Sequence, residues 1–280
     1  MPSHPAQAPP SSEPPWGWPS PPGPGLPPGS PSGSFPGPDP WGPPPETAVD
    51  ARRWGIGDVL WGLLIVIGLS VVFSIPIAVA QLAGVELGMV WITVVSVVAM
   101  WAGFFGWPLY CAKRKGLGSL KADFGFTMEW YDLLIGIAAG IGSLVLIAII
   151  GIIEINVAEQ APESNTQVIS EATGTPIALV IVVLGAPVFE ELFFRGLTYG
   201  AVDKRFNRWA ALAVSTVLFT VLHAQPAATA LGFGLFLARI GAIGLVLGVL
   251  RMTTGRLGAP IVAHMTVNGV ATIAVLAGGA

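Results

Sequence analysis

The stretch GAPVFEELFFRGLTYG, residues 185–200, lies inside a long apolar segment that has the composition of a membrane span. It carries two adjacent carboxylates, Glu190 and Glu191, and one guanidinium, Arg195. These are the side chains that the hydrocarbon core of a bilayer tolerates least. A spanning helix with this sequence therefore needs partners for its charges on neighbouring helices.

The composition of the whole chain supports a membrane location. Of the 280 residues 53% are hydrophobic and only 10% are charged, whereas about a quarter are charged in an ordinary soluble domain. The net charge of −3 and the lack of a basic patch with interleaved aromatics exclude nucleic acid as a partner. The single cysteine, Cys111, has no second thiol for a disulfide, and we expect it to pack at a helix end.

The first 49 residues differ from the rest because they hold most of the 26 prolines, interleaved with glycine and serine. Such a sequence buries too little apolar surface to fold, so we expect a disordered cytoplasmic tail over residues 1–49 without a signal peptide. A solvated spacer is one interpretation. The other is a ligand for a domain that recognises proline-rich motifs, aided by Trp16, Trp18 and Trp41.

Seven apolar segments of roughly 16 to 25 residues follow, each near the ~20 residues that cross a bilayer as a helix. They cover residues 58–81, 88–111, 132–153, 177–201, 209–225, 228–250 and 257–277. The sequence thus predicts an all-α polytopic transmembrane bundle of about seven spans. Three N-terminal transmembrane helices and their loops fall in residues 50–176, and the other four in residues 177–280.

The loop charges predict the orientation of these spans. Basic residues gather in four loops that all lie on one side if every segment spans: Arg52, Arg53; Lys113, Arg114, Lys115, Lys121; Lys204, Arg205, Arg208; Arg251, Arg256. The opposite side receives acidic residues: Glu86, Glu154, Glu159, Glu163 and Glu171. By the positive-inside rule the N-terminus is cytoplasmic, and we expect the plasma membrane as the location.

Polar residues inside three spans form the candidate site. Besides the charges of residues 185–200 they are His223 in the fifth span and His264 with Asn268 in the seventh. A central charge costs about 2.5 to 3.5 kcal/mol on insertion, so these groups need internal partners. The spacing of four puts Glu191 and Arg195 on one helical face, and His264 and Asn268 likewise.

The depth of these groups in the bilayer indicates that they converge. At 1.5 Å rise per residue, the polar side chains lie about 10 to 21 Å from the expected cytoplasmic ends of their helices. Arg239, in the sixth span, comes out at about 16 Å and could face the same cavity.

Two kinds of chemistry fit this set. A carboxylate and an imidazole can activate water, while a second imidazole and an amide stabilise the oxyanion that forms when the water attacks a carbonyl. Glu190, His223 and His264 could instead hold Zn²⁺, which lowers the pKa of its bound water to about 7. Structural roles stay open as well: His223 as a helix cap, Asn268 as interhelical glue, and Glu191 with Arg195 as an ion pair.

Three motifs in order, EELFFR (190–195), FTVLH (219–223) and HMTVN (264–268), resemble those of the CPBP intramembrane protease family. This family includes the type II CAAX prenyl endopeptidases and the Abi proteins. The resemblance covers roughly residues 177–275 and implies that residues 177–280 are the catalytic helices of a membrane endopeptidase, of either metalloprotease or glutamate type. It further implies a peptide or protein substrate in membrane lipid.

The resemblance also implies a role for each residue of the site. Glu190 would be the general base together with His223. His264 and Asn268 would stabilise the oxyanion or complete a metal site, and Glu191 with Arg195 would hold the first helix in place. Two other classes remain: a non-catalytic membrane scaffold or immunity-type protein of the same fold, and a transporter whose carboxylates carry protons.

Overall fold

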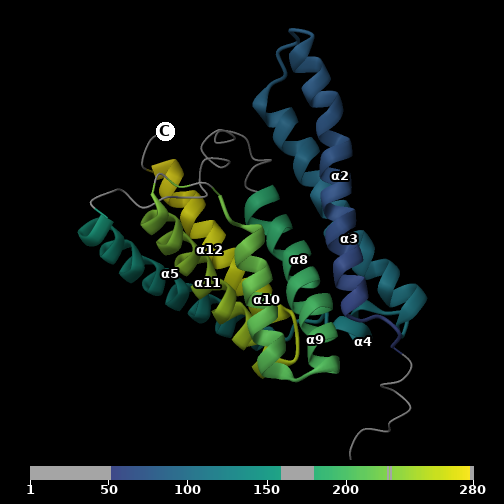
Figure 1. Cartoon of the computed structure of the whole chain (residues 1–280). Helices are drawn as coiled ribbons and strands as arrows, with labels where there is room; N and C mark the ends of the chain where they lie inside the picture. Colours follow the sequence, from purple (N-terminus) through teal and green to yellow (C-terminus); the bar gives the residue numbers. More distant parts are fainter. Residues whose placement is uncertain (1–51, 159–179, 226, 228, 278–280) are drawn as a thin grey trace, which may run out of the picture. The chain divides into compact units, whose positions relative to one another are not determined.

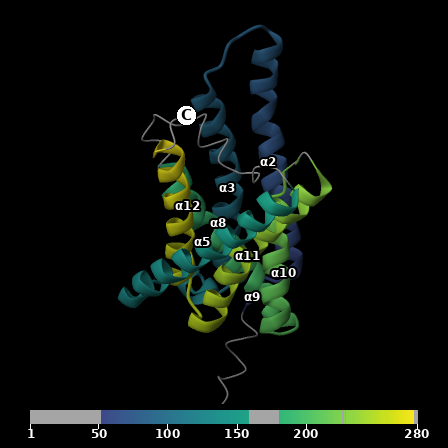
Figure 2. The same ribbon diagram turned by 90° about the vertical axis from the view of Figure 1, so that its left-hand side faces the viewer.

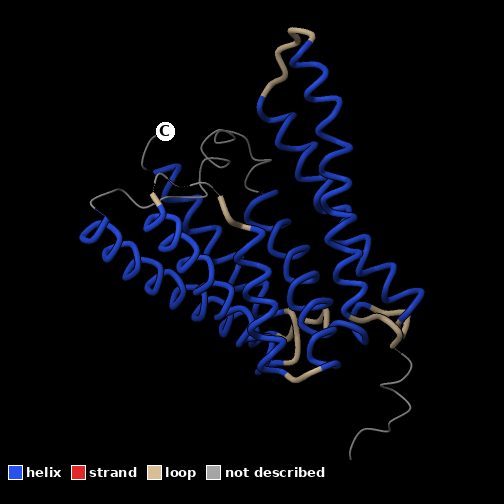
Figure 3. Tube along the Cα trace, viewed as in Figure 1, coloured by secondary structure: helices blue, strands red, loops and turns tan. Residues whose placement is uncertain are grey.

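The computed structural model of the chain describes residues 52–158, 180–225, 227 and 229–277. The predicted tail, residues 1–49, and the predicted loop residues Glu159, Glu163 and Glu171 lie outside the described residues. Helices are the only regular elements in the described ranges (Figure 3). The prediction of an all-α fold is therefore confirmed.

Each of the seven apolar segments contains a helix wherever the structure describes it. The helices are α2 (Ile56–Leu82), α3 (Met89–Lys115), α5 (Trp130–Ala158), α10 (Arg208–Leu222), α11 (Ala230–Thr254), α12 (Gly258–Ala277), and the unbroken helical segment 180–205. A further short helix, α4 (Leu120–Phe124), follows α3.

Within the described residues, five helices are long and apolar enough to cross a membrane: α2, α3, α5, α11 and α12. The two other expected spans differ from a simple spanning helix. Helix α10 has 15 residues, and segment 180–205 alternates between π-helical and α-helical turns. The chain is thus an integral membrane protein, and both the short helix α10 and the irregular segment 180–205 are among the spans that carry the polar residues.

Segment 180–205, which we call the central helix, consists of η1 (Val180–Gly185), α8 (Ala186–Glu191), η2 (Leu192–Thr198) and α9 (Tyr199–Arg205). Pro187 contributes no backbone N–H and so interrupts regular α-helical bonding just after η1. The wider π-helical turns are often found at functional sites. Here η1 ends at Gly185, one helical turn before the two glutamates, and η2 begins directly after Glu191.

The central helix contacts most of the other helices. It packs against α3, α10 and α12, and η2 also contacts α4, α2 and α11 (Figure 1). Aromatic side chains fill much of this contact, since Phe193 and Phe194 are fully buried against Phe104, and Phe194 also packs edge-on against Phe219. Helix α12 in turn packs along α5, and α11 along α5 and α10 (Figure 2).

The four basic loops meet at one end of these helices. Trp54 donates its indole N–H to Asp123, and Lys204 donates to the carbonyl of Trp54, which ties the start of α2 to α4 and α9. At the start of α5, Asp132 receives two hydrogen bonds from Arg256, and this pairing raises the pKa of Arg256 above its ordinary value. The cytoplasmic location of this end stays a prediction.

Helices α5 and α12 approach closely at two glycines of α5, Gly136 and Gly140. A Cβ atom added at Gly140 would lie 2.6 Å from Thr266 Cβ and 2.9 Å from the carbonyl oxygen of Ala263, both on α12. A Cβ at Gly136 would lie 2.5 Å from Val262 Cβ. Small residues at this spacing let transmembrane helices pack backbone to backbone.

We expect Gly140→Ala to lower the free energy of unfolding by about 1 to 3 kcal/mol, because the added methyl group overpacks the contact. The measurement is reversible unfolding in mixed detergent micelles. Gly142→Ala is the matched control on the same helix, since nothing lies within 4 Å of its added Cβ. Equal stability of the two variants would contradict close packing at Gly140.

Candidate active site

Glu190 lies in α8 with its side chain pointing into the contact with α10 and α12. It is 7% exposed, and its Oε2 atom is buried without a hydrogen-bond partner in the described part of the chain. Two imidazole nitrogens face this oxygen: Nε2 of His223 at 3.4 Å and Nε2 of His264 at 3.9 Å. The structure thus brings together three of the predicted residues from three helices.

His223 is the C-terminal capping residue of α10, one residue after the helix ends. Its Nδ1 atom lies 2.8 Å from the carbonyl oxygen of Phe219, and its ring lies 4.2 Å from the Phe219 ring. A carbonyl oxygen only accepts, so Nδ1 carries the proton and donates it. In the neutral ring, Nε2 is then the acceptor, and it points at Glu190.

His264 is buried in α12 and is oriented by a different group. Its Nδ1 atom lies 3.0 Å from Oε1 of Glu191. A carboxylate that orients one nitrogen of an imidazole fixes the tautomer and raises the basicity of the other nitrogen. The sequence spacing predicts a partner for Glu191 only within its own helix, namely Arg195. The contact with His264 could not be predicted, because sequence spacing does not show which residues of different helices meet.

Glu191 and Arg195 form the predicted ion pair, with both side chains fully buried and Nη1 3.1 Å from Oε1. Arg195 also donates through Nη2 to the carbonyl of Gly244 in α11, at 2.8 Å. Its guanidinium lies 4.5 Å from the centre of the Phe219 ring. Arg195 thereby connects the central helix to α10 and α11, and Oε1 of Glu191 connects it to α12.

Asn268 makes a hydrogen bond away from Glu190, and its role in stabilising an oxyanion stays a prediction. Its Nδ2 atom donates to the carbonyl of Val182 in η1, at 2.9 Å. The amide therefore links α12 to the π-helical turn that precedes α8. Asn268 lies on the same helix as His264. Its side chain bonds to a backbone carbonyl, and the described residues show no contact between Asn268 and Glu190.

Arg239 of α11 lies in an ion pair with Glu154 of α5, with Nη2 3.5 Å from Oε2. The sequence pattern predicts that Glu154 lies in an acidic loop after the third span, which ends at residue 153. This was wrong, because α5 continues to Ala158 and the side chain of Glu154 is 1% exposed. A buried carboxylate needs a cation, and Arg239 supplies it.

The charges around Glu190 determine which protons the site holds. Glu190, Glu191 and Arg195 together carry one net negative charge, and burying a net charge is costly. One additional proton on Glu190 or on a neighbouring Nε2 makes the cluster neutral and gives Oε2 of Glu190 a hydrogen-bonded partner. A proton added to this group of one carboxylate and two imidazoles would therefore offset the buried charge.

Glu190, His223 and His264 are residue types that bind zinc in proteins. The Nδ1 atom of each histidine also lies beside an oxygen that can accept its proton, as is usual for histidines that bind a metal. Among the residues that the structure describes, however, no group of three His, Cys, Asp or Glu side chains has an arrangement that could hold a metal ion. The zinc site stays a prediction. The mechanism below uses only groups of the chain.

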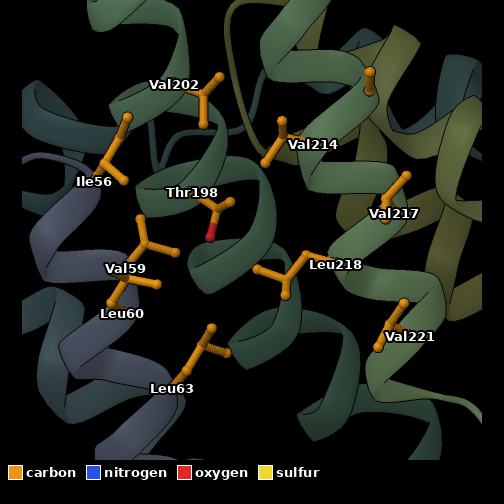
Figure 4. Close-up of a pocket in the computed structure, with 11 residues that line it drawn as sticks. Ile56, Val59, Leu60, Leu63, Thr198, Val202, Val214, Val217, Leu218 and Val221 are labelled. Atoms are coloured by element: carbon orange, nitrogen blue, oxygen red, sulfur yellow. The ribbon is translucent and has the colours of Figure 1, made fainter.

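An apolar pocket of about 420 Å³ lies on another face of the central helix, between α2 and α10. Figure 4 shows α2 residues such as Leu60 facing Val217 of α10, with Thr198 between them. None of the predicted site residues lines this pocket, and the Oγ1 atom of Thr198 is buried without a hydrogen-bond partner. The pocket is separate from the cluster around Glu190.

The part of the chain that is similar to known proteins contains the helices that carry Glu190, His223 and His264. Residues 172–270 match the family model of the type II CAAX prenyl endopeptidase Rce1-like proteins. The "Putative membrane peptidase YdiL" of Bacillus subtilis (strain 168) is 29% identical over 105 residues, which are 37% of this chain and 40% of that protein. The chain thus aligns with about two fifths of the length of this relative.

No solved structure matches the chain. The family match includes all three motifs and every predicted site residue from Glu190 to Asn268. The resemblance predicted from these motifs is therefore confirmed for residues 172–270, which are similar to the type II CAAX prenyl endopeptidase Rce1-like family.

Proposed function

We propose that this chain is an intramembrane endopeptidase of the CAAX-protease type that hydrolyses a peptide bond with water activated by Glu190 and His223. The observation that carries the proposal is the unpartnered, buried Oε2 of Glu190 facing two histidine nitrogens. Three acceptors that converge in this way are satisfied by a species that donates hydrogen bonds, and water is such a species. The Rce1-like match supports the reaction class.

The proposed mechanism starts with a water molecule hydrogen-bonded to Oε2 of Glu190 and Nε2 of His223. Glu190 accepts one proton while the water oxygen attacks the peptide carbonyl carbon, which forms a tetrahedral oxyanion. The intermediate collapses when the bond from carbon to nitrogen breaks and Glu190 returns the proton to the leaving amine. The products are a carboxylic acid and an amine, so atoms and charge balance.

His264 is proposed to stabilise the oxyanion. When its ring carries a proton on Nε2 as well as on Nδ1, it is a donor to an oxygen, and the carboxylate of Glu191 stabilises the resulting imidazolium. Arg195 holds Glu191 in place for this role. Asn268 is proposed to act indirectly, because its amide holds α12 against η1.

The finer points of the proposal rest on sequence patterns. The family name points to a peptide with a C-terminal CAAX motif as substrate. The basic loops favour a cytoplasmic N-terminus and a site reached from the cytoplasmic half of the plasma membrane. If zinc takes part, Glu190, His223 and His264 would hold it, and the metal would supply an activated water and polarise the carbonyl.

The test compares the membrane proteomes of cells that produce the wild-type chain and His223→Ala. We expect peptides cleaved by the wild type to disappear with His223→Ala, because the imidazole that shares the water with Glu190 is gone. Equal accumulation of the two proteins in the membrane is the control. Identical peptide profiles would overturn the peptidase proposal.

A second measurement distinguishes the two forms of catalysis. The metal content of the purified protein is determined, and cleavage is assayed before and after chelation. Loss of cleavage on chelation, with recovery on adding Zn²⁺, would assign the three residues to a metal site. Unchanged cleavage by metal-free protein supports direct activation of water by Glu190.

A further inference from the structure

A pocket of about 420 Å³ that is lined by charged and apolar residues lies at the end of the helices where the basic loops meet, away from the cluster around Glu190. It is formed by the end of the central helix, the start of α10 and the end of α11. Its lining residues are Tyr199, Asp203, Asn207, Arg208, Arg251, Met252 and Gly255. No role of the proposed peptidase uses these residues.

Arg251 is held rigidly against this pocket. Its Nη1 atom donates to the carbonyl oxygen of Gly255, and its guanidinium lies 5.9 Å from the centre of the Tyr199 ring. On the other side, a Cβ atom added at Gly125 would lie 2.4 Å from Nη1, so backbone packs directly against the guanidinium. The charged group is thus already ordered, which lowers the entropy cost of binding a ligand.

The same guanidinium is only partly satisfied by these contacts. Its Nε atom is buried without a hydrogen-bond partner, and no carboxylate of the described residues lies within ion-pair distance. A buried donor of a charged group costs free energy when it is unsatisfied. An anion in the pocket would supply the opposite charge.

Two further donors line the pocket from the start of α10. Arg208 is exposed, and its charge is likewise in no ion pair with a described residue. The Oδ1 atom of Asn207 accepts from the backbone N–H groups of Trp209 and Ala210, which leaves the Nδ2 amide as the donor. The pocket thus offers two guanidinium groups and an amide, against one carboxylate from Asp203.

The position of the pocket indicates the source of the anion. Phe206 and Trp209, which are both 62% exposed, flank its lining residues in the sequence at the end of the transmembrane helices. Exposed aromatic rings at helix ends lie at the level of lipid headgroups. Basic pockets between helices at this level bind the phosphate of lipid headgroups, and the guanidinium fork fits phosphate oxygens.

We propose that the pocket between α9, α10 and α11 binds the phosphate group of a membrane phospholipid through Arg251 and Arg208. Asp203 lies where it can accept from a hydroxyl or ammonium group of the same headgroup. A bound lipid at this position joins the ends of three helices, two of which also carry groups of the site, so it stabilises their packing.

The experiment measures lipid binding to the purified full chain in detergent by native mass spectrometry, with phosphatidylglycerol as the probe and inorganic phosphate as competitor. Glu190→Gln serves as background, so the result does not depend on the peptidase proposal. We expect Arg251→Gln to weaken binding of phosphatidylglycerol about 10-fold or more, as the loss of a charge-assisted hydrogen bond does. Arg208→Gln, an exposed position that leaves the fold intact, should weaken it in the same direction.

Arg205→Gln is the matched control, because Arg205 is exposed at the same end and contacts Phe206 but does not line the pocket. Equal affinity in the Arg251, Arg208 and Arg205 variants would show general attraction to a basic surface and overturn the site. Displacement of the lipid by millimolar inorganic phosphate would overturn the lipid assignment in favour of a soluble phosphate.

Discussion

Replacing Glu190 with glutamine is expected to lower the rate of peptide hydrolysis by a factor of about 10² to 10⁴, the contribution of a general base. Glutamine has nearly the same size and occupies the same space between α8, α10 and α12. It cannot accept the proton of the attacking water. The measurement is cleavage of a peptide substrate, identified from the proteome comparison, by purified protein in detergent.

The stability of the same variant provides an independent check on this interpretation. Glu190 contributes a buried charge whose Oε2 has no hydrogen-bond partner, so neutralising it removes a cost of folding. We therefore expect Glu190→Gln to unfold at the same or a higher temperature than the wild type. Such a gain of stability with a loss of activity is typical of residues kept for function.

Glu154→Gln is the matched control, since Glu154 is also a buried glutamate within a spanning helix but is paired with Arg239. Its activity per folded molecule should stay near that of the wild type. Full activity of Glu190→Gln, or an equal loss of activity with Glu154→Gln, would contradict the role of Glu190 as the base.

The helices could be predicted from the sequence because the bilayer imposes a simple rule on length and composition. An apolar run of about 20 residues has no other stable form in hydrocarbon than a helix. The residues at which the helices end were harder to predict. The third span continued beyond residue 153 because Glu154, which looked like a loop residue, has a cation on α11 as its partner.

The convergence of Glu190, His223 and His264 was also predictable, since the depth of each group follows from its distance to a helix end. The individual contacts were not. The position of His264 Nδ1 beside Glu191 depends on how α12 packs against α8, and residues 73 apart in sequence meet there. Asn268 shares a helical face with His264 but lies one turn, about 5.4 Å, further along α12. At that position its amide meets the carbonyl of Val182.

The largest expected effect on stability comes from Arg195. Removing one partner of a buried ion pair costs about 3 to 5 kcal/mol, because the other charge stays buried without compensation. Arg195→Gln leaves Glu191 in this state and also removes the hydrogen bond to the carbonyl of Gly244. We expect a loss of stability in this range, measured by reversible unfolding in mixed detergent micelles, with Arg205→Gln within about 0.5 kcal/mol of the wild type as an exposed control.

A double-mutant cycle with Glu191→Gln separates the ion pair from the packing of the guanidinium against Phe219. If the pair dominates, Glu191→Gln combined with Arg195→Gln is more stable than Arg195→Gln alone, because the unpaired carboxylate is gone. Additive losses would instead assign the effect to the cation over the Phe219 ring and to the bond with Gly244. Since Glu191 also orients His264, the double variant should regain stability without regaining hydrolysis, and recovery of both would contradict a role for Glu191 in positioning the imidazole.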